Sequence, residues 1–210
     1  MNILFAGDSW TYGEELKEKE IYRFSRLVCN ELNSTEFNIS NNGISNDDIF
    51  ERTTLFLNRN KNINFVVVQL TYLRRISIPN SNESVKKYRT LAPGSFNTFD
   101  KSVMLHYLGK SDKNIAWYDL TKYKLILFHN YLNVLNIDHM FMFIKNSDFS
   151  NLVMEDEEIC SSLKSKCVTN GIYDICVKEN LPIGKGSHAL EQGHEYIAEK
   201  IILPRIRSVS

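Results

Sequence analysis

Continuous apolar runs alternate along the chain with stretches in which apolar residues recur at helical spacing. The segment Phe65–Leu70 ("FVVVQL") is almost wholly apolar and rich in β-branched residues, which predicts a strand covered on both faces. Shorter runs predict further strands over Asn2–Ala6, Glu36–Ser40 and His139–Ile144. Helical spacing predicts helices over residues 20–33, 46–57, 98–108 and 117–135, and a terminal helix from Leu190 onward.

This alternation of strands and helices is typical of an α/β domain with a mainly parallel sheet. With 210 residues and no linker, repeat or low-complexity tract, the chain is expected to form one domain over residues 1–210. Residues 76–97 are polar and contain two prolines and a glycine, so we expect a long surface insertion there. Ligands of such sheets bind at the carboxyl ends of the strands, and Ser9 directly follows the first strand.

Charge and cysteine content narrow the function classes. Lysine plus arginine and aspartate plus glutamate both number 25, which argues against a non-specific nucleic-acid-binding protein, because such a protein needs a cationic surface. The first residues do not resemble a signal peptide, and no apolar stretch is long enough for a membrane span, so a cytoplasmic protein is expected. No CxxC pair occurs, which argues against a zinc site at Cys29, Cys160, Cys167 and Cys176. Reduced thiols are expected, with disulfides in a secreted protein as the alternative.

The stretch "AGDSWTYG" at residues 6–13 ends the first strand in a glycine, an acid and a serine. From local chemistry alone, Ser9 is equally well explained as the cap of a following helical turn or as a nucleophile at the end of the sheet. A nucleophilic serine needs a base for its proton and donors for the developing oxyanion. The stretch is not the G-x-S-x-G nucleophile elbow, because Thr11 stands where that motif has glycine.

Two glycine-containing segments supply candidates for those roles. Gly43 lies between a predicted strand and a predicted helix, where its N–H suits an oxyanion donor, although a turn glycine before an N-cap at Ser45 or Asn46 is the commoner interpretation. His188 lies in the loop "GKGSH" just before the terminal helix, a position that suits a general base. Packed or exposed roles are expected for the other histidines, His106, His129, His139 and His194.

Three blocks occur in order through nearly the whole chain: "GDSWTYG" near the start, "G-x-S-N-D-x-I" over Gly43–Ile49, and "L-P-x-G-x-G-x-H" over Leu181–His188. Together they resemble the GDSL/SGNH hydrolase superfamily, and most closely its small members from phages and bacteria. The resemblance implies a flavodoxin-like, three-layer α/β/α sandwich. It also implies an activity such as that of esterases, lipases, thioesterases or carbohydrate deacetylases.

The resemblance gives each matched position a role. Ser9 becomes the nucleophile and one oxyanion donor, Gly43 the second donor, and His188 the general base. Asp8 becomes a structural residue of the first block, and Asn46 a supporting residue of the second. No metal and no organic cofactor are implied.

The segment after the central strand departs from the family pattern. The family has G-x-N-D there, and its asparagine side chain donates to the oxyanion, whereas this chain reads "VVVQLTYLRR" without an asparagine. The hydroxyl of Thr71 or Tyr72 is then the expected donor, and Arg74 or Arg75 the expected source of positive charge. Loss of one oxyanion donor typically lowers the rate by about 10²–10³.

The approach to the histidine departs as well. The family has an aspartate two or three residues before it, and this chain has Lys185 and Gly186 at those positions. His188 is then expected to act in a Ser–His dyad, oriented by a backbone carbonyl or by another carboxylate such as Asp174 or Glu191.

The expected function is a serine-dependent ester hydrolase, of the esterase or carbohydrate O-deacetylase type, acting through an acyl-serine intermediate on a small acyl ester or an acylated glycan. The two departures leave alternatives open. One is a glycan-binding or assembly protein with a weakened site, and another is an O-acyltransferase. The insertion at 76–97 is expected to form a lid or substrate wall in each.

Overall fold

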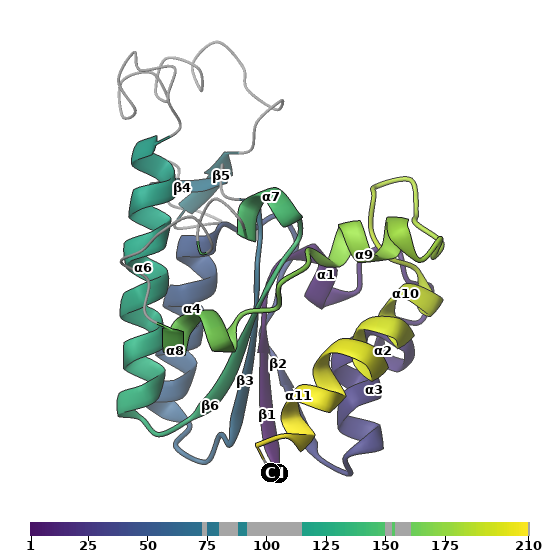
Figure 1. The fold of residues 1–210 in the computed structure, drawn as a ribbon, viewed down its shortest axis with the longest axis horizontal. Coiled ribbons are helices and arrows are strands. Elements are labelled where there is room, and N and C mark those ends of the chain that lie inside the picture. The colour runs from purple at the N-terminus through teal and green to yellow at the C-terminus, as the bar shows by residue number, and fades with distance from the viewer. Residues whose placement is uncertain (73–74, 80–87, 92–114, 150–152, 154–160, 210) are drawn as a thin grey trace.

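The core of the structure is a sheet of four parallel strands (Figure 1). The computed structural model describes all residues except 73–74, 80–87, 92–114, 150–152, 154–160 and 210. The strands lie in the order β2-β1-β3-β6, with β1 at Asn2–Ala6, β2 at Thr35–Asn38, β3 at Phe65–Leu70 and β6 at Asp138–Phe143. Beyond β6, a single parallel bridge from Phe141 to Cys167 takes the place of the fifth strand of the flavodoxin-like order.

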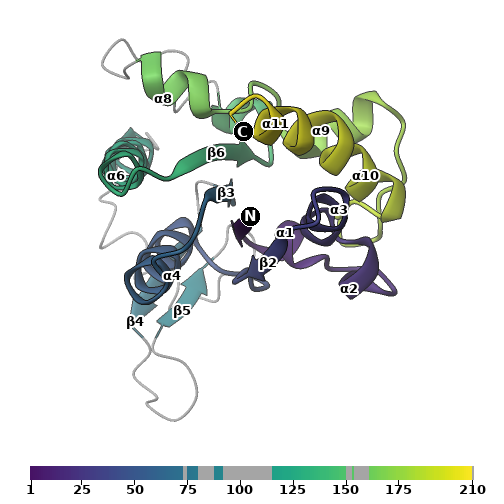
Figure 2. The ribbon, with the colours of Figure 1, turned by 90° about the horizontal axis from the view of Figure 1, so that it is seen from below.

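Helices cover both faces of the sheet and complete a three-layer α/β/α sandwich, which confirms the expected fold class (Figure 1, Figure 2). One face carries α4 (Asn46–Arg59), α6 (Ile115–Val134) and α8 (Ser161–Lys166). The other face carries α1 (Ser9–Tyr12), α2 (Lys19–Tyr22), α3 (Phe24–Glu31), α9 (Ile172–Lys178), α10 (Glu191–Tyr196), the π-helical η2 (Ile197–Ile202) and α11 (Leu203–Arg207). The short helix α7 (Asn146–Phe149) follows β6 directly.

Alternate side chains of the central strands feed two separate cores. In β1, Leu4 and Ala6 pack on the side of α4 and α6, while Ile3 and Phe5 pack on the side of α3 and η2. All six residues of β3 are buried, as its apolar sequence predicts. Because both faces are covered, only the ends of the strands remain available for a site.

The helix predicted over residues 20–33 is instead two helices, α2 and α3, separated at Arg23. The backbone of Arg23 is extended, with φ −63° and ψ 140°. Its guanidinium forms a bidentate ion pair with Glu36 of β2, and the Phe24 N–H donates to Nδ1 of His194 at 3.1 Å. These tertiary contacts replace the helical hydrogen bonds lost at the break, so packing outweighs the periodicity.

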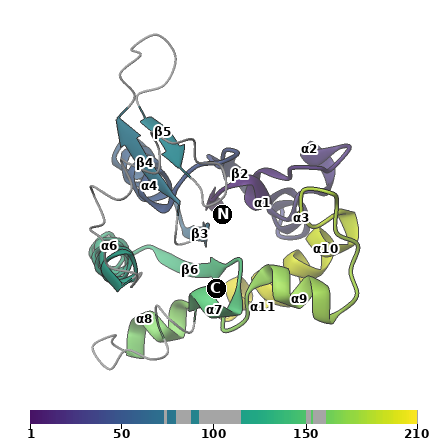
Figure 3. The same ribbon diagram turned by 90° about the horizontal axis from the view of Figure 1, so that it is seen from above.

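Within the insertion expected over residues 76–97, the described part is an antiparallel pair of strands. β4 (Ile76–Pro79) pairs with β5 (Tyr88–Leu91), and β4 lies beside α4 (Figure 3). The helix predicted over 98–108 lies outside the described residues.

The terminal helix begins as predicted but changes pitch in its second half. Pro204 lacks an N–H and its ring would clash with the carbonyl of Lys200 in a regular α-helix. The π-helical turn η2 ends at Ile202, two residues before Pro204, and relieves this conflict, and the chain then continues as α11. No helix in the described part of the chain is long and apolar enough to cross a membrane.

Candidate active site

Ser9 lies where β1 turns into α1. Gly7 makes the tight turn possible, because a Cβ there would lie 2.2 Å from Oγ1 of Thr11 and 2.8 Å from Oε1 of Gln69. The cap of α1 is Asp8, whose carboxylate accepts from the Trp10 N–H at 3.1 Å. Ser9 is therefore the first residue of the helix rather than its cap, and its hydroxyl is left for another partner.

That partner is His188. The loop before α10 closes on itself, since the Gly184 N–H donates to the carbonyl of His188 and Ile183 bridges to Ala189. This fold brings Nε2 of His188 to 2.8 Å from Oγ of Ser9. The two residues are separated by almost the whole chain, and the structure places them in hydrogen-bond contact.

The other ring nitrogen of His188 contacts Glu15, a residue that the sequence reasoning missed. Oε2 of Glu15 lies 3.0 Å from Nδ1 of His188. The expected candidates, Asp174 and Glu191, do not take this place: Asp174 accepts from the Asn146 N–H, and Glu191 lies in the first turn of α10. The expectation of another carboxylate holds, but its identity was wrong.

Several features of the chain hold the Glu15 carboxylate in position. Its two oxygens accept from the Gly186 N–H at 2.8 and 2.9 Å, and Oε2 also accepts from the His188 N–H at 3.3 Å. A Cβ on Gly184 would lie 2.7 Å from this carboxylate, so the glycine leaves the space that it fills. Glu15 itself has φ +67°, a left-handed conformation that is uncommon for glutamate.

These contacts also fix the protonation of the site. The Gly186 N–H, with the contacts to His188 and against the effect of burial, lowers the pKa of Glu15, so the carboxylate stays ionised and only accepts hydrogen bonds. The proton of neutral His188 then lies on Nδ1, facing Glu15, and Nε2 accepts from the Ser9 hydroxyl.

The two predicted backbone donors have no partner in the part of the chain that the structure describes. Neither the N–H of Ser9 nor that of Gly43 donates a hydrogen bond to a described residue. Gly43 has φ +69° and precedes α4, whose N-cap is Ser45 in a capping box with Asp48. Both N–H groups therefore remain available to a developing negative charge.

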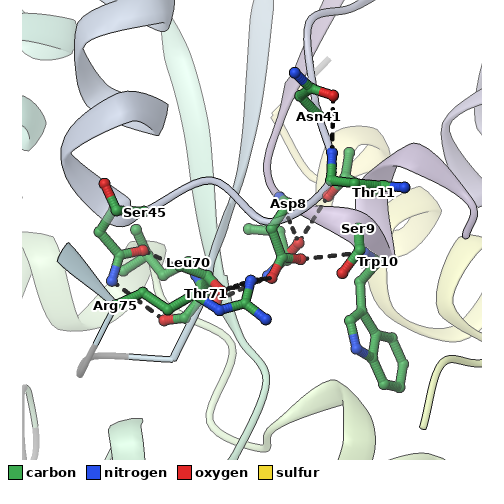
Figure 4. A network of polar contacts seen from close by, with 12 residues as sticks. Asp8, Ser9, Trp10, Thr11, Asn41, Ser45, Leu70, Thr71 and Arg75 are labelled. Atoms are coloured by element: carbon green, nitrogen blue, oxygen red, sulfur yellow. Dashed lines mark hydrogen bonds and ion pairs between the residues drawn. The ribbon is translucent and has the colours of Figure 1, made fainter. Parts of the chain in front are cut away.

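Thr71 has no donor left for an oxyanion (Figure 4). Its hydroxyl donates to Oδ2 of Asp8 at 2.5 Å, and its N–H donates to Oδ1 of Asn46 at 2.8 Å. The amide of Asn46 also donates to the Thr71 carbonyl, so this supporting residue clamps the segment after β3. Arg74 lies outside the described residues, and it is Arg75 that forms the ion pair with Asp8, at 2.9 Å.

The remaining described histidines and cysteines are packed in the protein interior. Among the described residues, no group of three or more potential metal ligands occurs. His194, His129 and His139 are buried, in keeping with a packed role, and His106 is not described. The described cysteines, Cys29, Cys167 and Cys176, are free and buried, and burial raises their pKa values to about 12, 12 and 11.

Comparison with solved structures identifies the fold; no family model and no curated protein matches the sequence. A structure of TesA aligns over 100% of both chains with a TM-score of 0.65 at 11% identity. The psychrotrophic esterase EstA from Pseudoalteromonas sp., inhibited by monoethylphosphonate, aligns over 99% of this chain and 97% of its own with a TM-score of 0.61 at 13% identity.

A member of the lipolytic protein G-D-S-L family from Veillonella parvula aligns over 95% of both chains, with a TM-score of 0.51 at 12% identity. At identities this low, the structural alignments establish the fold alone, and the activity has to be inferred from the geometry of the site. The chain has the fold of the GDSL/SGNH hydrolases.

Proposed function

We propose that this protein is a serine-dependent ester hydrolase. The observation that carries the proposal is the continuous chain of contacts from Ser9 through His188 to Glu15, a nucleophile, a base and an orienting acid in hydrogen-bond contact. The unpaired N–H groups of Ser9 and Gly43 supply two oxyanion donors of the kind that acyl transfer needs.

The reaction follows from these contacts. His188 takes the hydroxyl proton through Nε2 as Oγ of Ser9 attacks the ester carbonyl, and Glu15 stabilises the imidazolium that forms. The carbonyl electrons move to the oxyanion, which the two backbone N–H groups stabilise. Collapse expels the alcohol, which takes the proton from His188. Water then attacks the acyl-serine with His188 again as base, releasing the acid and restoring Ser9.

The substrate proposed is a small acyl ester or an acylated glycan. The solved structure of EstA, itself an esterase with this fold, supports the ester class. A weakened binding site was the alternative because the family's asparagine and aspartate are absent. Glu15 fills the place of the acid, and this observation favours catalysis over binding alone.

Covalent labelling tests the proposal. A fluorophosphonate probe should label the wild-type protein, while Ser9→Ala should not react, because the proposed nucleophile is the Ser9 hydroxyl that contacts His188. Ser40→Ala serves as a matched control that should label like wild type. p-Nitrophenyl acetate hydrolysis should fall at least about 10³-fold in Ser9→Ala.

Equal labelling of wild type and Ser9→Ala, or no labelling of either, would contradict the proposal. Acyl transfer to an added sugar alcohol in place of water, measured with the same ester, would identify the acyltransferase alternative.

A further inference from the structure

Arg75 uses its guanidinium incompletely. Among the described residues its hydrogen bonds are made by Nη1 alone, to Oδ2 of Asp8 and to Oγ1 of Thr71, both at 2.9 Å. The N–H groups of Nε and Nη2 donate to no described residue. Arg23, a structural arginine of the same chain, instead engages Nε, Nη1 and Nη2 with two carboxylates.

The guanidinium of Arg75 is held in one position rather than moving freely in solvent. Its side chain is 18% exposed, and its partner Asp8 is fully buried. The guanidinium also lies 5.5 Å from the centre of the Tyr72 ring. A guanidinium fixed on one nitrogen, with its remaining N–H groups unpaired, is preorganised to bind a second anion.

A second cation lies along the same end of the sheet. Lys145 directly follows β6 and Ile144, and its ammonium lies 3.9 Å from the centre of the Tyr173 ring. It forms no ion pair with a described residue. The positive charge of Arg75 is balanced by the negative charge of Asp8. Lys145 therefore supplies net positive charge, whereas Arg75 supplies N–H donors in fixed directions.

Both cations lie on the route from Ser9 along the strand ends. The strands run in the order β1-β3-β6, and Ser9, Arg75 and Lys145 follow these strands in that order. Aromatic contacts join the last of them to the site: the Tyr173 ring lies 6.3 Å from Trp10, and Trp10 lies 6.1 Å from His188. A substrate held at Ser9 and extending toward β6 would meet two tyrosines and two cations.

We infer that the substrate of this site carries an anionic group, a carboxylate or a similar oxyanion, that is bound by Arg75 with the support of Lys145. The inference rests on the proposed hydrolase function and adds the chemical class of the ester. Tyr72 and Tyr173 offer ring faces beside the two cations, which suits a cyclic acidic substrate such as an acidic sugar or an aromatic acid.

Two pairs of matched esters test this assignment. Each pair differs only in one carboxylate: p-nitrophenyl hemiglutarate against p-nitrophenyl butyrate places it in the acyl group, and acetoxybenzoate against its methyl ester places it in the leaving group. Wild type should prefer the anionic member of at least one pair by about tenfold in kcat/KM, the size expected for one charge-assisted contact. Arg75→Gln should reduce that preference to near one, Arg75→Lys should keep part of it, and Lys145→Gln should lower it less.

Lys178→Gln, an exposed lysine on α9 that is not part of this set, serves as the charge control and should keep the full preference. No anionic preference in wild type, or equal losses on both members of a pair in Arg75→Gln, would overturn the inference while hydrolysis of the neutral esters upheld the hydrolase. A binding measurement tests for an anion site independently of hydrolysis. Glutarate and benzoate should raise the melting temperature of Ser9→Ala, and the rise should be lost when Arg75→Gln is added. Such binding without any ester turnover would uphold the anion site and refute the hydrolase.

Discussion

The Glu15 carboxylate contacts three hydrogen-bonding groups of Gly186 and His188, and all three belong to the loop that carries His188. This carboxylate accepts from two backbone N–H groups and from the imidazole, so one side chain both orders the loop and orients the imidazole of His188. A glutamine would keep the size and one oxygen but would lose the charge that stabilises an imidazolium.

Glu15→Gln should therefore lower kcat for ester hydrolysis by about 10²–10⁴ with little change in KM. Because the pKa of Glu15 is lowered from 4.5, its protonation should not limit wild-type activity until the pH falls below that value. Kinetics over a pH series measure both effects. Glu18→Gln, an exposed acid that makes no cap contact before α2, is the control. A matching loss in the control, or full activity in Glu15→Gln, would contradict this role.

The sequence could supply some of these residues and not others. Ser9 and His188 belong to recognisable blocks, and the structure brings them to 2.8 Å. Glu15 belongs to no block and lies 173 residues from His188, so only the tertiary fold reveals the pair. The signals that were present are modest: an acid six residues after Ser9, and two glycines before His188 that leave room for a side chain.

At the level of elements, the loop between α9 and α10 leaves space for the Glu15 carboxylate. Gly184 and Gly186 both face the Glu15 carboxylate, and side chains on either would occupy its place. The backbone N–H groups that donate to the Glu15 carboxylate also belong to this loop. One short segment therefore sets both the position of the carboxylate and the space available to it.

Gly184→Ala should reduce activity while leaving stability nearly unchanged. The added Cβ would lie 2.7 Å from the end of a flexible side chain, which can move away at little cost but then leaves Nδ1 of His188. We expect kcat/KM to fall about 10–10²-fold and the melting temperature to shift by about 2 °C or less. Enzyme kinetics and calorimetry measure these two quantities.

Lys185→Ala, between the two glycines, should keep normal activity. In a Glu15→Gln background, Gly184→Ala should cause little additional loss, because both changes remove the same contact. Full additivity of the two losses would show that the glycine acts through another residue.

Strand prediction succeeded where burial dominates the pattern. β1 and β3 have the predicted bounds, since their apolar residues face two cores. β4 and β5 were missed because their segment is polar, contains Pro79 and carries no short hairpin turn signal. Helices α8 and α9 were not predicted either, since six or seven residues are too few for a clear helical period.

Across the whole molecule, buried histidines set the response to acid. His129 Nδ1 and His139 Nε2 lie 2.8 Å apart, and His139 Nδ1 contacts the Ile137 carbonyl. One arrangement of neutral tautomers satisfies these contacts: each Nδ1 donates, and Nε2 of His129 accepts from Asn133. Burial lowers the pKa of His139 to about 4, and burial lowers that of His194 to about 3.

The free energy of unfolding should therefore fall as the pH drops. The unfolded chain binds these protons near pH 6.5, whereas the folded protein binds them only near pH 4 or below, so stability is complete above 6.5 and is lost below it. Between pH 7 and about pH 5, each histidine should contribute a loss of about 1–2 kcal/mol. Urea unfolding at a series of pH values measures it.

The buried carboxylate of Glu36 does not titrate in that range, because burial opposed by the Arg23 and Ser25 contacts leaves its pKa below 4.5. His139→Asn should show a shallower slope between pH 6.5 and 5 than wild type. A flat wild-type profile over this range would mean that the buried histidines are protonated in the folded protein.

The distance in sequence between His188 and its two partners has a consequence for folding. Ser9 and Glu15 lie near the start of the sequence, and His188 lies near its other end. Ser9 and Glu15 are close in sequence, but His188 reaches them only when the segment leading into α10 docks beside α1 and α3. Reactivity of Ser9 therefore requires that these two distant segments have already come into contact. Time-resolved labelling of Ser9 during refolding would therefore measure when the segments that carry Ser9 and His188 come into contact.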